Sequence, residues 1–71
     1  MTPPLAALTD REEEVLRCIA SGHGMREIGS LLGMAEGTAK WHRENILRKL
    51  GARNSADAVR IYVERKAGVS V

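Results

Sequence analysis

Residues 26–51 read REIGSLLGMAEGTAKWHRENILRKLG. This stretch predicts two amphipathic helices, one over about Met25–Leu32 and one over about Glu36–Leu50. Gly33 is expected to end the first helix, because glycine adopts the left-handed conformation of a helix C-terminus without steric cost. Only two residues then precede the second helical pattern. A turn this short between two amphipathic helices indicates a helix-turn-helix.

Apolar residues in both helices recur at three- and four-residue spacing, which is the period of one helix face. In the first helix the predicted inward residues are Ile28, Leu31 and Leu32. In the second helix the predicted inward residues are Ala39, His42, Ile46, Leu47 and Leu50. We expect His42 to be a hydrogen-bonded core residue rather than a ligand. The opposite face of the second helix carries Gly37, Lys40, Trp41, Glu44 and Arg48.

Two further helices are expected on either side of this unit. Thr9 and Glu12 have the spacing of a capping box, in which the two side chains satisfy amide groups at a helix start. A helix is therefore predicted from residue 10 to just before Gly22. Either Asn54 or Ser55 can cap a last helix, which is expected to run to about residue 66.

A chain of 71 residues holds one small domain, which gains from a partner because it buries a modest share of its surface. No segment has the sustained two-residue alternation of a β-strand. The sequence therefore predicts an all-α fold, a small four-helix domain over residues 8–66. Residues 1–7 are expected to be a flexible leader and residues 67–71 a flexible tail.

The charges are distributed unevenly along the chain. Residues 1–36 carry three basic and six acidic side chains, a net charge of −3; residues 37–71 carry eight basic and three acidic ones, a net charge of +5. A basic half is typical of a phosphate-binding surface, although a solvated, charge-mixed helix surface fits it equally well. One Trp, one Tyr and no Phe argue against single-strand binding, which uses aromatic stacking platforms.

The residues give little support to catalysis or metal binding. Cys18, His23 and His42 are too scattered for a metal site, and no nucleophile, base and acid can be brought together. We therefore expect no enzyme, no metal, no cofactor and no small-molecule ligand. The single cysteine suits a reducing cytoplasm, and no apolar run approaches the roughly 20 residues that span a bilayer. A cytoplasmic protein without membrane contact is expected.

Motifs along nearly the whole chain are similar to those of one family. LTDREEEVL at residues 8–16 looks like L-T-x-R-E-x-E-V-L, and residues 26–51 look like K-E-I-A…L-G-I-S…T-V-K-x-H…I-x-x-K-L. ARNSADAV at residues 52–59 is similar to the start of the family's last helix. These are motifs of the LuxR-type (GerE-like) helix-turn-helix family, which includes response regulators of the NarL/FixJ type. The resemblance covers roughly residues 8–66.

The resemblance implies a sequence-specific double-stranded DNA-binding domain of a bacterial transcription regulator. Its recognition helix, about Glu36–Leu50, would lie in the major groove. By motif position, base edges would be contacted by Lys40, Trp41 and Glu44. Arg26 and Thr38 fall at positions that meet phosphates. Positions usually given to ion pairs within the domain hold Arg11, Glu12, Glu14, Glu27 and Lys49.

The place of two arginines on the recognition helix adds to this set. Arg43 lies on its flank and Arg48 near its end, where contacts to backbone phosphates are expected. One recognition helix supplies few base contacts, so we expect a homodimer on a two-fold site. Its interface is predicted on the last helix, from Ala58, Val59, Tyr62 and Val63. Double-stranded DNA is the main expected partner, and RNA polymerase is a further candidate.

Several residues depart from the family pattern around the recognition helix. Ala35 stands where a serine usually caps this helix, a loss of about 1 kcal/mol. Gly29 and Ala39 replace larger residues, and Gly37 adds roughly 1 kcal/mol of helix cost if it is helical. These departures predict a recognition helix that is loosely held in the free protein and ordered by DNA or a partner.

Two residues leave alternatives open. Glu44 can accept a hydrogen bond from a cytosine amino group, or pair with Lys40 or Arg48 at four-residue spacing. Trp41 can contact a thymine methyl group, meet another protein chain, or pack beside Asn45 or Arg48. The glutamates and the missing cap favour an alternative function, a protein-interaction module that retains the helix-turn-helix fold without reading DNA.

Overall fold

The computed structural model describes residues 8–66, and within them it contains four α-helices and no β-strand. The helices are α1 (Asp10–Ala20), α2 (Met25–Leu32), α3 (Glu36–Leu50) and α4 (Ser55–Lys66). The predicted all-α, four-helix fold is therefore confirmed. The leader and tail expected at residues 1–7 and 67–71 lie outside the described residues.

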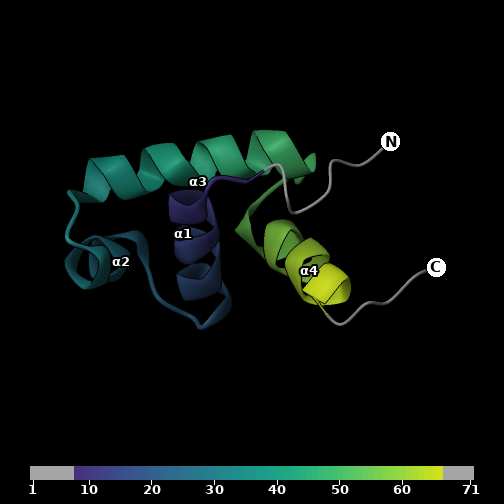
Figure 1. Cartoon of the computed structure of the whole chain (residues 1–71), viewed down its shortest axis with the longest axis horizontal. Helices are drawn as coiled ribbons and strands as arrows, with labels where there is room; N and C mark the ends of the chain where they lie inside the picture. Colours follow the sequence, from purple (N-terminus) through teal and green to yellow (C-terminus); the bar gives the residue numbers. More distant parts are fainter. Residues whose placement is uncertain (1–7, 67–71) are drawn as a thin grey trace.

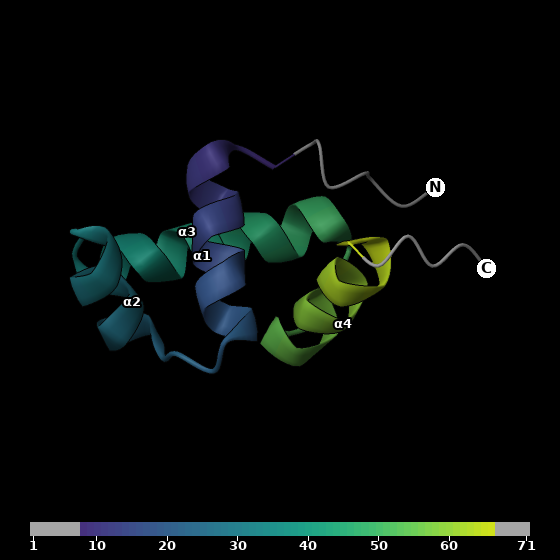
Figure 2. The same cartoon turned by 60° about the horizontal axis from the view of Figure 1, so that its bottom comes forward.

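The longest helix, α3, lies along one side of the molecule (Figure 1). The other three helices are all on the same side of it: α1 runs across its middle, α2 lies near its beginning and α4 near its end (Figures 1 and 2). α1 contacts each of the other helices, and α3 also contacts α2 and α4. One long face of α3 is consequently not covered by any of the other three helices.

The core lies where the four helices meet around α1, and each helix contributes buried apolar side chains to it. The residues with no exposed surface are Val15, Leu16, Ile28, Ala39, Ile46 and Ala58. The buried set is completed by Leu50, Leu8, Ile61 and Tyr62.

None of the four helices in residues 8–66 is long and apolar enough to cross a membrane. The cytoplasmic location stays a prediction.

The capping box at the start of α1 is confirmed. Thr9 Oγ1 accepts a hydrogen bond from the Glu12 amide at 3.1 Å, and the Thr9 amide donates to Glu12 Oε1 at 2.9 Å. Glu12 is buried, and its Oε1 also accepts from Lys49 Nζ of α3 at 2.7 Å. Burial alone would raise the pKa of Glu12, but the hydrogen bonds from Lys49 and Thr9 and the Lys49 charge together lower this pKa. One carboxylate thus joins the start of α1 to the end of α3.

The turn between α2 and α3 is tighter than the sequence suggested. Gly33 ends α2 with φ of 67°, the left-handed conformation predicted for it. Gly29 is buried within α2, and a Cβ there would lie 2.6 Å from the Met34 carbonyl oxygen. The Met34 amide also donates to the Gly29 carbonyl at 2.8 Å. The expectation that Gly29 loosens the helix-turn-helix is therefore wrong. A Cβ at this position would collide with the Met34 carbonyl, so glycine allows the turn to pack directly on α2.

One predicted core position in α2 is exposed. Ile28 is fully buried and Leu32 is partly buried against the core, but Leu31 is 56% exposed. Successive helix residues are about 100° apart, so Leu31 points away from the face that Ile28 and Leu32 share.

The start of α4 resolves the choice between its two candidate caps. Asn54 Oδ1 accepts from the Asp57 amide at 2.8 Å, so Asn54 is the cap. Asp57 Oδ2 in turn accepts from the Arg53 amide at 3.0 Å. Asp57 also accepts from the Arg60 guanidinium, and these contacts lower its pKa, the Arg53 amide having the largest effect. Ser55 is left to bond elsewhere.

Candidate nucleic-acid interface

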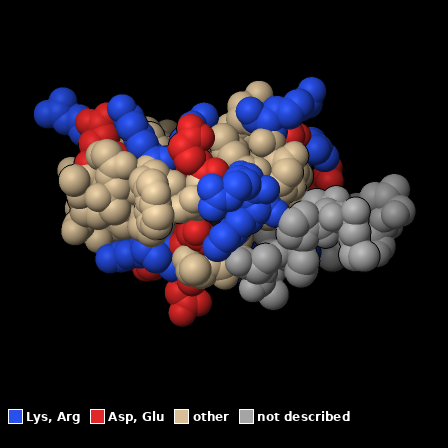
Figure 3. All heavy atoms as spheres, turned by 90° about the horizontal axis from the view of Figure 1, so that it is seen from above, with Lys and Arg blue, Asp and Glu red and all other residues tan. Residues whose placement is uncertain are grey.

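The uncovered face of α3 carries the five side chains predicted for it. Gly37, Lys40, Trp41, Glu44 and Arg48 are all exposed, and they are spaced so that they form one stripe. We call these residues the α3 outer face. Figure 3 looks onto this side of the molecule, where basic and acidic side chains are mixed around a broad uncharged area toward the beginning of α3. The face is therefore mixed in charge rather than uniformly basic.

The beginning of α3 lacks a side-chain cap, as its sequence predicted. Ala35 is the N-cap residue, with extended φ and ψ of −67° and 153°, and it makes no side-chain hydrogen bond. Gly37 is helical, and a Cβ there would meet no atom within 4 Å. Glycine is thus not required by packing at Gly37, in contrast to Gly29. Whether this start of α3 is loosely held in solution stays a prediction.

Ion pairs engage both glutamates of α3. Glu36 Oε2 lies 3.4 Å from Lys40 Nζ, and Glu44 Oε1 lies 3.4 Å from Arg43 NH1. The expected pairing of Glu44 with Lys40 or Arg48 is therefore wrong. Arg48 NH2 instead donates to Asn45 Oδ1 at 2.8 Å. The charges on this side of the domain largely compensate one another in pairs of neighbours.

Arg43 has an internal role that the sequence did not predict. Its Nε donates to Ser55 Oγ at the start of α4 at 2.7 Å, and its NH1 faces Glu44. The Arg43 side chain is 30% exposed, against 65% for that of Glu44. A phosphate contact from Arg43, as expected from its place on the helix flank, would fall to its NH2 group or displace the contacts that Nε and NH1 make within the domain.

Trp41 projects into solvent, and its nearest ring is that of the neighbouring histidine. Trp41 is 62% exposed, and its ring lies edge-on to His42 with the centroids 5.1 Å apart. His42 is partly buried, and its Nδ1 is buried with no hydrogen-bond partner among the described residues. The prediction of a hydrogen-bonded core histidine is therefore wrong, since its ring packs at the edge of the core beside an exposed tryptophan.

The other predicted phosphate contacts lie at the surface. Arg26 is exposed at the start of α2, and Thr38 is exposed in the first turn of α3. Arg48 is exposed near the end of α3. The assignment of these three residues to phosphates, and of Lys40, Trp41 and Glu44 to bases, stays a prediction.

The residues predicted for a dimer interface on α4 divide between the interior and the surface. Ala58 has no exposed surface and Tyr62 is 9% exposed, so both belong to the core of the single chain. Val59 is partly exposed and Val63 is 53% exposed. Ala58 and Tyr62 are thus removed from the predicted interface, because an apolar helix face packed on α1 and α3 is not available to a second chain.

Two of the ion pairs expected within the domain are present, and Glu27, the fifth residue expected to pair, contacts a histidine instead of a Lys or Arg side chain. Arg11 NH1 lies 3.2 Å from Glu14 Oε1, and Glu12 pairs with Lys49 as described above. Glu27 Oε1 lies 2.6 Å from His23 Nδ1 in the loop before α2. All three contacts lie away from the α3 outer face, so they stabilise the scaffold.

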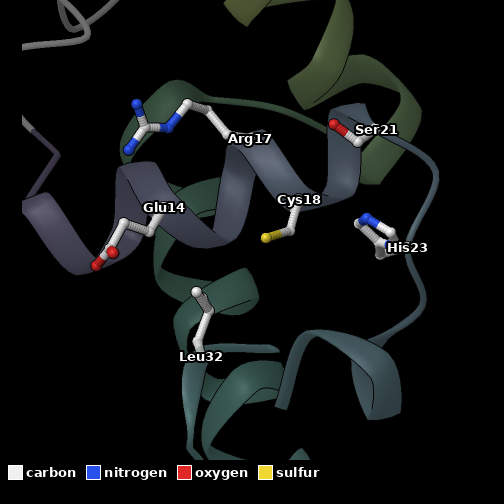
Figure 4. Close-up of a pocket in the computed structure, with 6 residues that line it drawn as sticks. All are labelled: Glu14, Arg17, Cys18, Ser21, His23 and Leu32. Carbon is white, nitrogen blue, oxygen red and sulfur yellow. The ribbon is translucent and has the colours of Figure 1, made fainter. Parts of the chain in front are cut away.

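A shallow hollow of about 220 Å³ lies between the end of α1 and α2, away from α3 (Figure 4). It is lined by Glu14, Arg17, Cys18, Ser21, His23 and Leu32. Cys18 is partly buried against the core, and the His23 ring is engaged with Glu27. Within residues 8–66 no three His, Cys, Asp or Glu side chains are grouped so as to hold a metal ion.

Comparison with known proteins places the chain in a family. Residues 6–62 match the family described as bacterial regulatory proteins, luxR family. NarP, a nitrate/nitrite response regulator protein of Escherichia coli, is 36% identical over 63 residues, which are 89% of this chain and 29% of that protein. A nitrate/nitrite response regulator protein homolog of Haemophilus influenzae is 42% identical over 62 residues, 87% of this chain and 30% of that protein.

The similarity extends to relatives with other names. SolR, a transcriptional activator protein of Ralstonia nicotianae, is 46% identical over 54 residues, 76% of this chain and 23% of that protein. The chain spans less than a third of the length of these relatives. The match nevertheless covers all four helices up to Tyr62, including the capping box and the helix-turn-helix. The chain belongs to the LuxR family of bacterial regulatory proteins.

Proposed function

We propose that this chain is the sequence-specific DNA-binding domain of a transcription regulator, with α3 lying in the major groove of double-stranded DNA. The observation that carries this proposal is the uncovered α3 outer face, with α1, α2 and α4 all behind it (Figure 1). The major groove is about 12 Å wide and admits one α-helix. A helix of 15 residues, roughly 22 Å long, can lie in it without obstruction from α1, α2 or α4.

In this proposal the three central side chains of the α3 outer face contact base edges. Lys40 donates to guanine acceptors, Trp41 contacts a thymine methyl group, and Glu44 accepts from an exocyclic amino group. Phosphates are bound by Arg26, Thr38 and Arg48. Arg43 is left out of the phosphate set, because its Nε and NH1 are engaged with Ser55 and Glu44.

The ion pairs on α3 do not prevent this mode of binding. The Lys40 and Glu36 side chains are 61% and 47% exposed, and exposed pairs contribute at most about 1 kcal/mol. A good base contact contributes roughly 1–3 kcal/mol of discrimination. Replacing the Glu36 contact of Lys40 with a guanine is therefore favourable. The pair lowers affinity for all sequences without removing the preference.

Dimerisation on a two-fold site is part of the proposal. A single recognition helix makes few base contacts, so two copies are needed for useful affinity. Val59 and Val63 are the apolar residues that α4 leaves for such an interface. Sedimentation velocity of the chain alone and with a palindromic duplex tests this point, and a complex of one chain per duplex at saturation would contradict it.

The alternative is a protein-interaction module that retains the fold. The exposed side chains of Trp41 and Leu31, at 62% and 56%, favour it, because large apolar groups at a surface often mark contact sites. The two readings differ in their salt dependence. Each cationic phosphate contact contributes about −0.9 to the slope of log affinity against log salt concentration. Arg26 and Arg48 together predict a slope of about −1.8 for each domain.

Titration of fluorescent duplex DNA over a range of salt concentrations decides between these functions. A DNA-binding domain should lose affinity about tenfold for each domain between roughly 50 and 200 mM salt. Replacing Arg26 and Arg48 with glutamine should flatten that dependence, while the exposed Arg11 on α1, replaced in the same way, serves as the matched control. Absence of duplex binding at the lowest salt concentration would contradict the proposal and favour the alternative.

A further inference from the structure

We infer that Glu44 selects a C·G base pair, and that Arg43 and Ser55 are the positioning residues that hold its carboxylate on the α3 outer face. This inference rests on the proposed function and specifies one base pair that the domain reads. It assigns a function to the side chains of Ser55, Arg43 and Glu44, which connect α4 with the exposed face of α3.

The three side chains form a continuous path. Ser55, the first residue of α4, accepts a hydrogen bond from Arg43 Nε at 2.7 Å, and this contact is partly buried. Arg43 NH1 then lies 3.4 Å from Glu44 Oε1. The path begins at a half-buried serine and ends on a carboxylate whose side chain is 65% exposed. The Glu44 carboxylate is thus connected through the Arg43 guanidinium to Ser55 of α4.

The shape of the guanidinium makes it suitable for positioning. Its donors lie in one rigid plane, so fixing Nε on Ser55 also fixes the direction in which NH1 points. The distance of 3.4 Å to Glu44 is longer than the roughly 2.7–2.9 Å of a strong charge-assisted bond. A carboxylate accepts about four hydrogen bonds, so this single contact orients Glu44 and leaves it able to accept from a base.

The chemistry of the carboxylate favours cytosine. It is acceptor-only when ionised, so it is repelled by guanine O6 and N7 and by thymine O4. Adenine offers an amino donor, but its N7 acceptor lies beside that donor and would face the second carboxylate oxygen. Cytosine itself presents only its amino donor to the major groove, and the nearest acceptor, O6, belongs to its guanine partner. Lys40, one helical turn before Glu44, can donate to guanine, which is the partner of cytosine.

The experiment begins with the wild-type chain and a random-sequence duplex library, from which bound DNA is sequenced. The preferred duplex is then remade with each other base pair at every selected C·G position. We expect one such position where substitution weakens binding roughly 5- to 140-fold. Glu44→Gln should change the preference at that position from cytosine to adenine, because the glutamine amide matches the adenine N6 and N7 pattern. A Glu44→Gln variant that keeps the wild-type preference at every position overturns the inference.

The positioning residues are tested on the same duplexes. Ser55→Ala should lower the discrimination at that position while leaving the salt dependence of binding unchanged, and Ser55→Thr, which keeps the hydroxyl group, should restore it. Ser21→Ala, at an exposed serine that follows α1, is the matched control. Unchanged discrimination in Ser55→Ala overturns the role of Arg43 and Ser55. A wild-type chain that binds every duplex equally overturns the proposed sequence-specific function itself, and the two failures are therefore distinguishable.

Discussion

Replacing Ala35 with serine should stabilise the domain by supplying the missing cap of α3. The residue already has the extended backbone of an N-cap, and its side chain makes no hydrogen bond. A serine hydroxyl there can accept from the amide of Thr38, the third residue of the helix. Because the loss of such a cap costs about 1 kcal/mol, we expect the free energy of unfolding to rise by about 1 kcal/mol. For a domain of this size the corresponding rise in Tm is roughly 4–8 °C.

Urea denaturation monitored by circular dichroism measures this effect. The matched control is Ala20→Ser at the end of α1, where a serine hydroxyl cannot cap a helix N-terminus. Helix propensity alone predicts that this change lowers the free energy of unfolding by up to about 0.5 kcal/mol. Amide exchange over residues 36–41 should also slow in Ala35→Ser. An unchanged or lower free energy of unfolding would refute the reasoning. Strong exchange protection of these amides in the wild-type chain would refute the prediction of a loosely held helix start.

Four further changes have defined outcomes. Lys40→Ala should weaken duplex binding by roughly 1–3 kcal/mol in anisotropy titrations, and unchanged affinity with intact folding would contradict a base contact. Gly29→Ala should lower the free energy of unfolding. Alanine gains about 1 kcal/mol of helix propensity, but its methyl group costs roughly 1–3 kcal/mol of overpacking against the Met34 carbonyl. A clear rise in the free energy of unfolding would contradict the close approach of Met34. Because the pKa of Glu12 is lowered in the folded domain, the ionised carboxylate stabilises the fold fully above its ordinary pKa of 4.5, and this stabilisation is lost as the pH falls below 4.5. The free energy of unfolding of Glu12→Gln, measured by denaturation, should therefore depend less on pH in that range. Val63→Asp should leave the helical content of the single chain intact and abolish dimers in sedimentation experiments, and dimers that persist would exclude the α4 surface.

The features that depend on residues close in sequence could be predicted from the sequence. The capping box requires only Thr9 and Glu12 three positions apart, and its two hydrogen bonds form within one turn. Gly33 and Gly51 end their helices with φ of 67°, which is a local property of glycine. The exposed stripe on α3 likewise follows from helix periodicity. The residues of the α3 outer face can therefore be identified from the sequence alone.

The features that depend on how helices meet could not be predicted in this way. An apolar stripe on the last helix can pack on its own domain or on a second chain, and the pattern alone does not distinguish Tyr62 in the core from Val63 at the surface. The requirement for glycine at Gly29 arises from the approach of the Met34 carbonyl across a turn. The bond between Arg43 and Ser55 joins two helices, so no spacing within one helix signals it.

In the proposed function, the α3 outer face is the surface that contacts DNA. Titrating the isotope-labelled chain with its selected duplex, and following amide chemical shifts by NMR, tests this claim most directly. We expect the largest shifts at Gly37, Lys40, Trp41, Glu44 and Arg48, with small shifts on α1. Largest shifts over α1 or around the hollow beside Cys18, with α3 unaffected, would contradict it.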